Sequence, residues 1–120
     1  MSNNNKVING EEFNERVKML STDVMKEVIA IFMDGYPERK KNIKDALKEN
    51  SAEKLEFEIH ALKNDLSQFA ATNLFADTET LLTKVREFQT TNVTKEIDSI
   101  EKTIESQLIP ELKHWKEQKA

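Results

Sequence analysis

Apolar residues recur along most of this chain at spacings of three and four, which is the period of an α-helix with one buried face. The first such run, over residues 13–20, predicts a short helix. Ser21 follows it and carries the kind of side-chain oxygen that caps helix N-termini. We therefore expect a second, strongly apolar helix over residues 24–32.

The next two helices are predicted from their boundary residues. Gly35 is expected to end the second helix, and Pro37 suits the first turn of a third, where its missing N–H has no cost. Asn50, with Glu53 three residues later, resembles a capping box for a fourth helix. The apolar stripe of this fourth helix consists of Leu55, Ile59, Leu62, Leu66 and Phe69.

Two more helices complete the pattern. A fifth over residues 74–88 can be capped by Thr72 or Asn73, and a sixth over residues 93–108 by Asn92. A proline follows the sixth helix and is expected to kink or end it.

Short connections make sequential helices antiparallel neighbours, and four long stripes can close around one core. We therefore expect an all-α fold, an antiparallel up-and-down four-helix bundle with one or two short extra N-terminal helices. Residues 1–10 are polar and rich in Asn, so they are expected to form a flexible N-terminal leader. Residues 11–120 would then form one helical bundle domain, and a monomer is expected because each stripe has a place in the bundle.

The composition excludes several classes of function. The net charge is −4 with acids and bases interspersed, so no basic stripe for nucleic acid is expected. The absence of cysteine excludes disulfides, thiolate metal sites and thiol nucleophiles. No apolar run approaches the ~18 residues of a membrane span, so we expect a cytoplasmic protein without a membrane partner.

The fourth helix carries the one group of residues that suggests chemistry. His60 lies about 100° around the helix from Ile59, at the margin of the apolar stripe. Lys63, Asn64 and Ser67 share its face. A neutral, exposed imidazole can accept a phosphoryl group, and a nearby ammonium can offset the charge of the phosphate oxygens. Such a pair is also common on helix surfaces, so the spacing by itself is a weak signal.

A wider pattern gives this group a context. Residues 23–87 resemble the histidine-containing phosphotransfer (HPt) family, whose hallmark is His-x-Leu-Lys-Gly in a four-helix bundle. Residues 60–64 read His-Ala-Leu-Lys-Asn. Residues 28–37 and 43–47 are similar to the stretch before the family's active helix, with its Phe, Pro and Ala-Leu positions, and residues 69–74 lie where these domains turn into the next helix.

This resemblance implies a phosphocarrier without intrinsic kinase activity, in a multistep two-component phosphorelay. His60 would accept a phosphoryl group from a receiver aspartate and pass it to another receiver. Lys63 would help to hold the phosphoryl oxygens, and Glu56, Asn64 and Ser67 would belong to the face that docks receivers. The implied partners are response-regulator receiver domains and a hybrid histidine kinase. The protein would need no cofactor, with Mg²⁺ expected on the receiver.

Three positions depart from the family pattern. Asn64 replaces a Gly that leaves space for the incoming receiver, and Ala70 replaces the usual turn Gly. Leu82 stands where many members have a Gln or Glu that orients the imidazole, a role that Thr78 or Glu79 could take instead. These departures motivate an alternative function, a non-catalytic HPt-like adaptor that binds receiver or kinase domains without phosphotransfer.

The C-terminal segment offers a weaker candidate site. Glu111 and His114 have the Glu-x-x-His spacing of di-iron bundles, but such sites need two motifs and two further carboxylates. We therefore expect no metal. Trp115 is expected to pack on the core rather than to anchor a partner.

Overall fold

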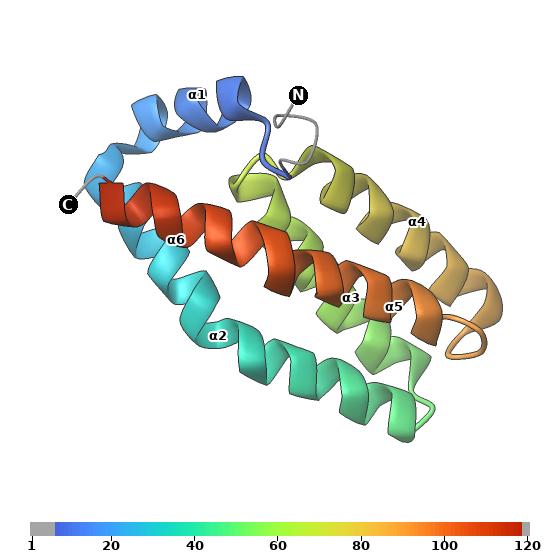
Figure 1. The fold of residues 1–120 in the computed structure, drawn as a ribbon. Helices are drawn as coiled ribbons and strands as arrows, with labels where there is room; N and C mark the ends of the chain where they lie inside the picture. The colour runs from blue at the N-terminus through green and yellow to red at the C-terminus, as the bar shows by residue number, and fades with distance from the viewer. Residues whose placement is uncertain (1–6, 119–120) are drawn as a thin grey trace.

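The computed structural model describes residues 7–118, and every regular element within that range is a helix. The expected all-α fold is therefore confirmed for these residues. The elements are α1 (Gly10–Leu20), α2 (Thr22–Lys48), α3 (Ala52–Gln68), α4 (Thr72–Phe88), α5 (Thr94–Thr103), the π-helical turn η2 (Ile104–Leu108) and α6 (Ile109–Gln118) (Figure 1).

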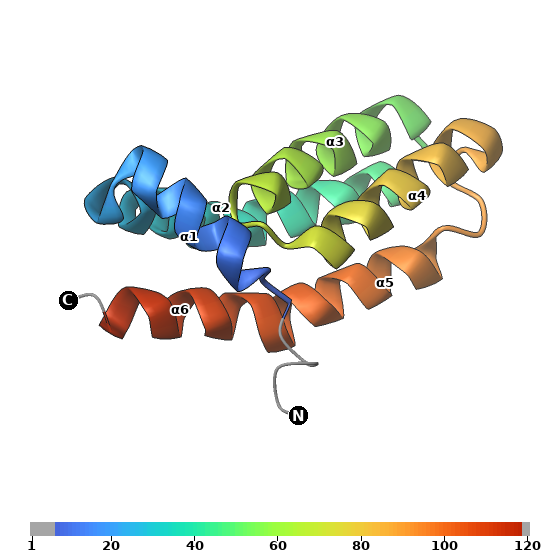
Figure 2. The ribbon, with the colours of Figure 1, turned by 90° about the horizontal axis from the view of Figure 1, so that it is seen from above.

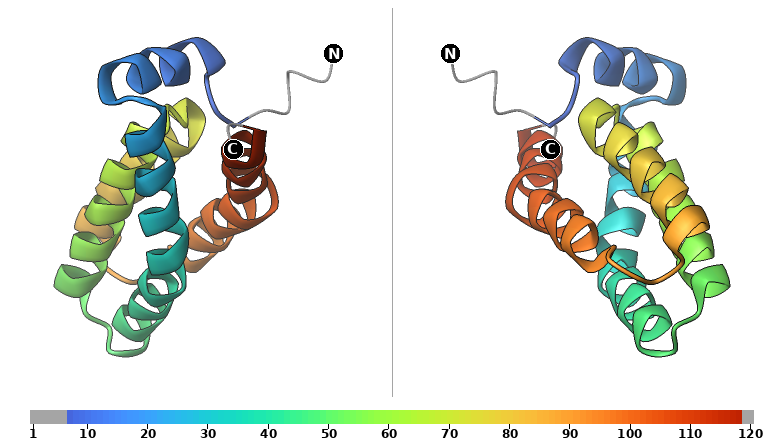
Figure 3. Two further views of the ribbon diagram at one scale, coloured as in Figure 1. Left: turned by 90° about the vertical axis from the view of Figure 1, so that its left-hand side faces the viewer. Right: turned by 90° about the vertical axis from the view of Figure 1, so that its right-hand side faces the viewer.

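The helices pack in a sequence of neighbours around one core. Helix α3 contacts α2 and α4, α4 also contacts α5, and α6 contacts α2. The stretch from α5 to α6 runs without a loop along the other long helices (Figure 2), and α1 lies across one end of the protein (Figure 3). No helix within residues 7–118 has the combined length and apolar character needed to cross a bilayer.

The helix break expected at Gly35 is wrong, because α2 continues through both Gly35 and Pro37. Its buried face extends past the proline, from Phe32 and Tyr36 to Ile43. Pro37 removes one backbone hydrogen bond, and prolines inside helices usually cause kinks. The ribbon of α2 changes direction near its middle (Figure 1). Burial of one continuous face therefore outweighs the local preference of these two residues.

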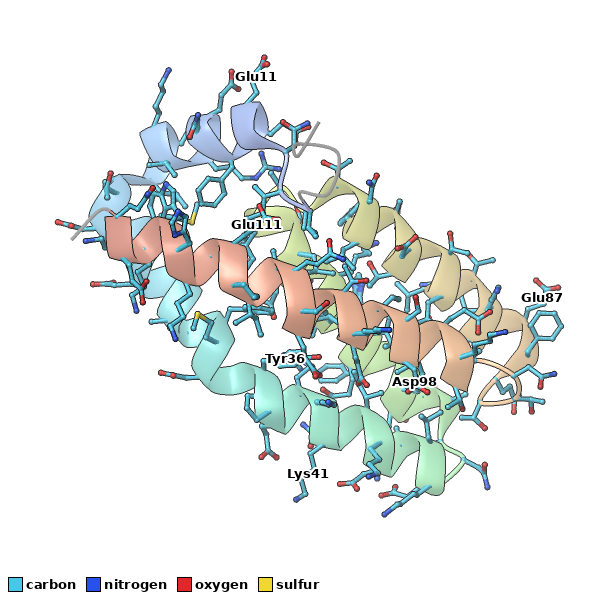
Figure 4. The ribbon with its side chains drawn as sticks, viewed as in Figure 1. Glu11, Tyr36, Lys41, Glu87, Asp98 and Glu111 are labelled. Carbon is cyan, nitrogen blue, oxygen red and sulfur yellow. The ribbon has the colours of Figure 1, made fainter. Side chains whose placement is uncertain are left out.

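The chain also stays helical past Pro110, which lies in the first turn of α6. The turn before it is widened, and the Ile109 N–H donates to the Ile104 carbonyl five residues back. This π-helical turn is the local adjustment at the proline. The Tyr36 hydroxyl donates to a Glu105 carboxylate oxygen at 3.0 Å, which ties the widened turn to α2, and Figure 4 shows Tyr36 between the two.

The helix caps follow the expectations only in part. Ser21 caps α2 as expected, with its Oγ accepting from the Val24 N–H at 3.2 Å. Asn50 does not cap α3, because Ser51 Oγ accepts from the Lys54 N–H instead. The expected caps of α4 and α5 are also wrong, since both helices begin without a side-chain cap, after Ala71 and Val93 in place of Thr72, Asn73 or Asn92.

The N-terminal end of the described chain is held by long-range contacts. Val7 is buried, and its N–H donates to Glu111 Oε1 at 2.7 Å. The Asn9 N–H donates to a carbonyl in the loop between α3 and α4. Phe13 of α1 packs edge-on against Trp115, with the ring centroids 5.2 Å apart. Residues 7–9 of the expected leader therefore contact the rest of the domain, and residues 1–6 lie outside the described range.

Candidate functional site

Helix α3 buries one face and turns His60 outward. Its buried residues, spaced by three and four, are Leu55, Ile59, Leu62 and Leu66. His60 falls between two of them in sequence but lies outside this stripe, and its side chain is exposed. No hydrogen bond or ion pair joins the imidazole to any other residue within 7–118. A partner molecule can therefore reach the ring without breaking an internal contact.

Lys63 lies one turn further along α3, but its ammonium is directed toward α4. The Lys63 Nζ is 3.8 Å from a Glu79 carboxylate oxygen and 5.4 Å from the centroid of the Phe75 ring. Only 19% of the Lys63 side chain is exposed. The cation that the HPt resemblance assigns to the phosphoryl oxygens is thus already engaged by two side chains of the neighbouring helix.

A second ion pair lies on the other side of His60. The Arg86 Nε is 2.6 Å from Glu56 Oε2, so Glu56, expected on the docking face, is paired with α4. The two pairs reflect the register of the two helices, because seven residues forward from Glu56 to Lys63 match seven residues back from Arg86 to Glu79. Four alternating charges therefore flank the imidazole.

The same register sets Leu82 opposite His60. Leu82 is only 3% exposed and offers no hydrogen-bonding group to the imidazole. Neither candidate substitute bonds the ring, since the Thr78 hydroxyl donates to the Phe75 carbonyl at 2.7 Å and Glu79 lies beside Lys63. Nothing on α4 within the described residues fixes the orientation or tautomer of His60.

The remaining predicted docking residues lie toward the C-terminal end of α3. Asn64 is exposed one turn after His60, and Ser67 is partly buried. The Ser67 carbonyl accepts a hydrogen bond from Arg16 Nε of α1 at 2.9 Å. Helix α1 therefore borders the face at Ser67 and leaves Asn64 open.

Phe57 belongs to the same outward face but was missed by the sequence reasoning. It lies three residues before His60 and is 69% exposed, although it is a large aromatic residue. Its position off the buried stripe of α3 was the available signal. Aromatic residues are enriched at the energetic centres of protein–protein contacts, so Phe57 is a candidate contact for a partner that reaches His60.

The opposite side of α3 carries a separate polar group. Arg39 of α2 pairs with Glu58 at 2.5 Å, and Asp65 lines a groove between α2 and α3. Burial raises the pKa of the Asp65 carboxyl, and the charge of Arg39 partly offsets this rise. Within residues 7–118, no three His, Asp or Glu side chains gather in a group that could hold a metal ion.

Comparison with protein-family models, with curated proteins and with solved structures finds no match for this chain. The functional interpretation therefore depends on the geometry around His60 and on the resemblance of residues 60–64 to the HPt motif.

Proposed function

We propose that this protein is a histidine phosphotransfer protein that carries a phosphoryl group on His60 between receiver domains of a phosphorelay. The observation that carries the proposal is the exposed His60 imidazole, which has no hydrogen-bond or ion-pair partner within residues 7–118 and lies one helical turn before Lys63. An exposed imidazole can act as a nucleophile when it is neutral. The nearby cation can offset the negative charge that arrives with the phosphoryl group.

The transfer needs two partners and no further reactant. The unprotonated nitrogen of His60 attacks the phosphorus of a receiver's aspartyl phosphate, an N–P bond forms, and the P–O bond to the aspartate breaks. The aspartate leaves as a carboxylate with the electron pair of that bond. The second receiver reverses these steps with its own aspartate. Mg²⁺ on the receiver would screen the phosphoryl oxygens, so His60 and its neighbours need no cofactor of their own.

The proposal includes the finer architecture and the cellular setting. We assign α2, α3, α4 and the stretch from α5 to α6 to an antiparallel up-and-down four-helix bundle, with α1 as an extra N-terminal helix. We propose a cytoplasmic monomer, since receivers and kinases of phosphorelays meet their carriers there.

A receiver that reaches His60 must also cover the residues one turn away on the outward face. Phe57 and Asn64 are those residues, and both are exposed. Phe57 would supply apolar contact area, while Asn64 would lie where HPt proteins usually have a Gly. The receiver therefore docks on the surface formed by Phe57, His60 and Asn64.

An adaptor that binds a receiver or kinase without phosphotransfer is the second candidate. Two observations favour it: the aliphatic Leu82 opposite His60, and the engagement of Lys63 by Glu79. Binding through Phe57 would serve an adaptor equally well. The two candidates differ only in whether His60 becomes phosphorylated.

The deciding experiment incubates the protein with a panel of phosphorylated receiver domains and Mg²⁺ and follows acid-labile, base-stable label. His60→Gln is the test variant. His114→Gln is the matched control, because His114 is the other histidine of the chain and is also exposed. Label on the parent and the control but not on His60→Gln is expected. Binding without label would favour the adaptor, and label on His60→Gln would overturn the assignment of the site.

A further inference from the structure

The contacts of Lys63 suggest that α4 controls when its charge is available. Phe75 and Glu79 are one turn apart on α4 and both face Lys63. The ammonium lies against the face of the Phe75 ring, while the Glu79 carboxylate supplies the opposite charge. Helix α4 thus holds the ammonium on the side of α3 that faces it.

The pair between Lys63 and Glu79 is loose enough to exchange. At 3.8 Å the two atoms are within ion-pair distance but beyond hydrogen-bond distance, and the Glu79 side chain is 55% exposed. Exposed ion pairs of this kind contribute little to stability. A phosphoryl group on His60 would bring up to two negative charges within one turn of Lys63. That group can compete with Glu79 for the ammonium, but the Glu79 carboxylate remains nearby.

We propose that Glu79 is a positioning residue that holds Lys63 before transfer and competes with the phosphoryl group for it afterwards. Glu79 thereby weakens the hold of His60 on the phosphoryl group and favours its transfer onward. The inference rests on the proposed function of His60 and adds a residue that the HPt resemblance does not assign. It acts through Lys63 and does not require contact between Glu79 and the phosphorus.

A test must separate the effects of the four charged residues nearest His60 on α3 and α4. Glu56 and Lys63 lie on α3, and Arg86 and Glu79 lie on α4. Glu56 is held by Arg86 at 2.6 Å, which leaves Lys63 and Glu79 as the loosely paired charges. Loss of the Glu79 charge can act through release of Lys63 or directly on the phosphoryl group. A double-mutant cycle with Lys63 distinguishes the two routes.

The first experiment needs no receiver. Untagged protein carrying His114→Gln has His60 as its one histidine and is labelled with phosphoramidate, which transfers its phosphoryl group to the imidazole nitrogen and releases ammonia. The titration midpoint of the phosphoryl group is then read from its ³¹P NMR shift. A nearby ammonium favours the dianion and lowers this midpoint. Glu79→Gln is expected to lower the midpoint further, by ~0.2–0.7 pH unit, the equivalent of an exposed ion pair.

Three further variants test the route. Glu79→Asp keeps the charge and should restore most of the parent value. In a Lys63→Met background, Glu79→Gln should have little effect, because the residue through which Glu79 acts is gone. Glu87→Gln is the matched control, since Glu87 lies at the far end of α4 (Figure 4), is exposed and makes no ion pair within residues 7–118. This control should leave the midpoint unchanged.

A receiver-dependent measurement gives the same comparison in the relay. At equilibrium with one phosphorylated receiver, Glu79→Gln should increase the ratio of phosphohistidine to aspartyl phosphate by up to about fivefold. If Glu79→Gln is labelled on His60 but its phosphoryl group has the same titration midpoint as in the parent, the role of Glu79 is overturned while the proposed function of His60 stands. The route through Lys63 would be overturned if Glu79→Gln lowered the midpoint equally in the Lys63→Met background, or if Glu87→Gln lowered it as much as Glu79→Gln does. Absence of label on His60 from both phosphoramidate and receivers would remove this inference together with the proposed function.

Discussion

Truncation of Phe57 to alanine tests whether a receiver docks on the surface formed by Phe57, His60 and Asn64. Phe57 is 69% exposed, so the domain itself gains little from burying it. Full burial of a phenylalanine side chain contributes ~1.5–3 kcal/mol. A partner that covers the exposed part therefore gains about 1–2 kcal/mol. Phe57→Ala should weaken receiver binding by about 5- to 30-fold and change the free energy of unfolding by less than about 0.5 kcal/mol.

Phe88→Ala provides the matched control. Phe88 is the last residue of α4 and is 51% exposed, so it presents the same side chain to solvent away from His60. Isothermal titration calorimetry with a receiver that labels the parent measures both dissociation constants, and urea unfolding measures both stabilities. Equal dissociation constants for Phe57→Ala and the parent, or equal weakening by the two variants, would refute docking over Phe57.

Two further predictions concern the fold. Ala70 has φ 54°, in the left-handed region that favours glycine, so Ala70→Gly should raise the free energy of unfolding by ~0.5–1 kcal/mol. Ala71 has φ −83°, so Ala71→Gly should lower the free energy of unfolding by a similar amount. Both changes are measured in the same urea titrations. The hydrogen bond from Lys40 holds the pKa of the Glu105 carboxyl below its usual value of 4.5. Its stabilisation is therefore fully present above pH 4.5 and is lost as the pH falls through the lowered pKa. Because the pair between Lys40 and Glu105 is largely exposed, Glu105→Gln should lower the free energy of unfolding by less than about 1 kcal/mol at pH 7. The difference in unfolding free energy between parent and variant should shrink in acid.

The fold could be predicted from the sequence wherever burial and local preference agree. The stripe of α3 and the cap at Ser21 are examples, since each follows from residues close together in the chain. The continuity of α2 through Gly35 and Pro37 could not be predicted from the sequence, because the buried face that continues across Pro37 gains its stability from packing against other helices. The helix through Pro110 is a similar case, in which a π-helical turn absorbs the proline.

The site could be predicted only along its own helix. The outward position of His60 and its shared face with Asn64 follow from the helical period of α3. The contact of Lys63 with Glu79 does not, because it depends on the register between two helices, which no local pattern encodes. Ala70 shows the same limit at a turn: its identity was visible in the sequence, but its positive φ was not.

The balance of charges around His60 limits how a phosphoryl group can be held there. Glu56 and Arg86 on one side and Lys63 and Glu79 on the other sum to no net charge, so these four residues together carry no excess of positive charge for an arriving phosphoryl group. A carrier must accept the group and also release it, and a neutral surround favours neither direction strongly. The receiver and its Mg²⁺ would then supply most of the attraction during transfer. Between partners, retention of the phosphoryl group would depend on how far Lys63 leaves Glu79, so in the proposed relay one loosely held ammonium would determine how long the group stays on His60.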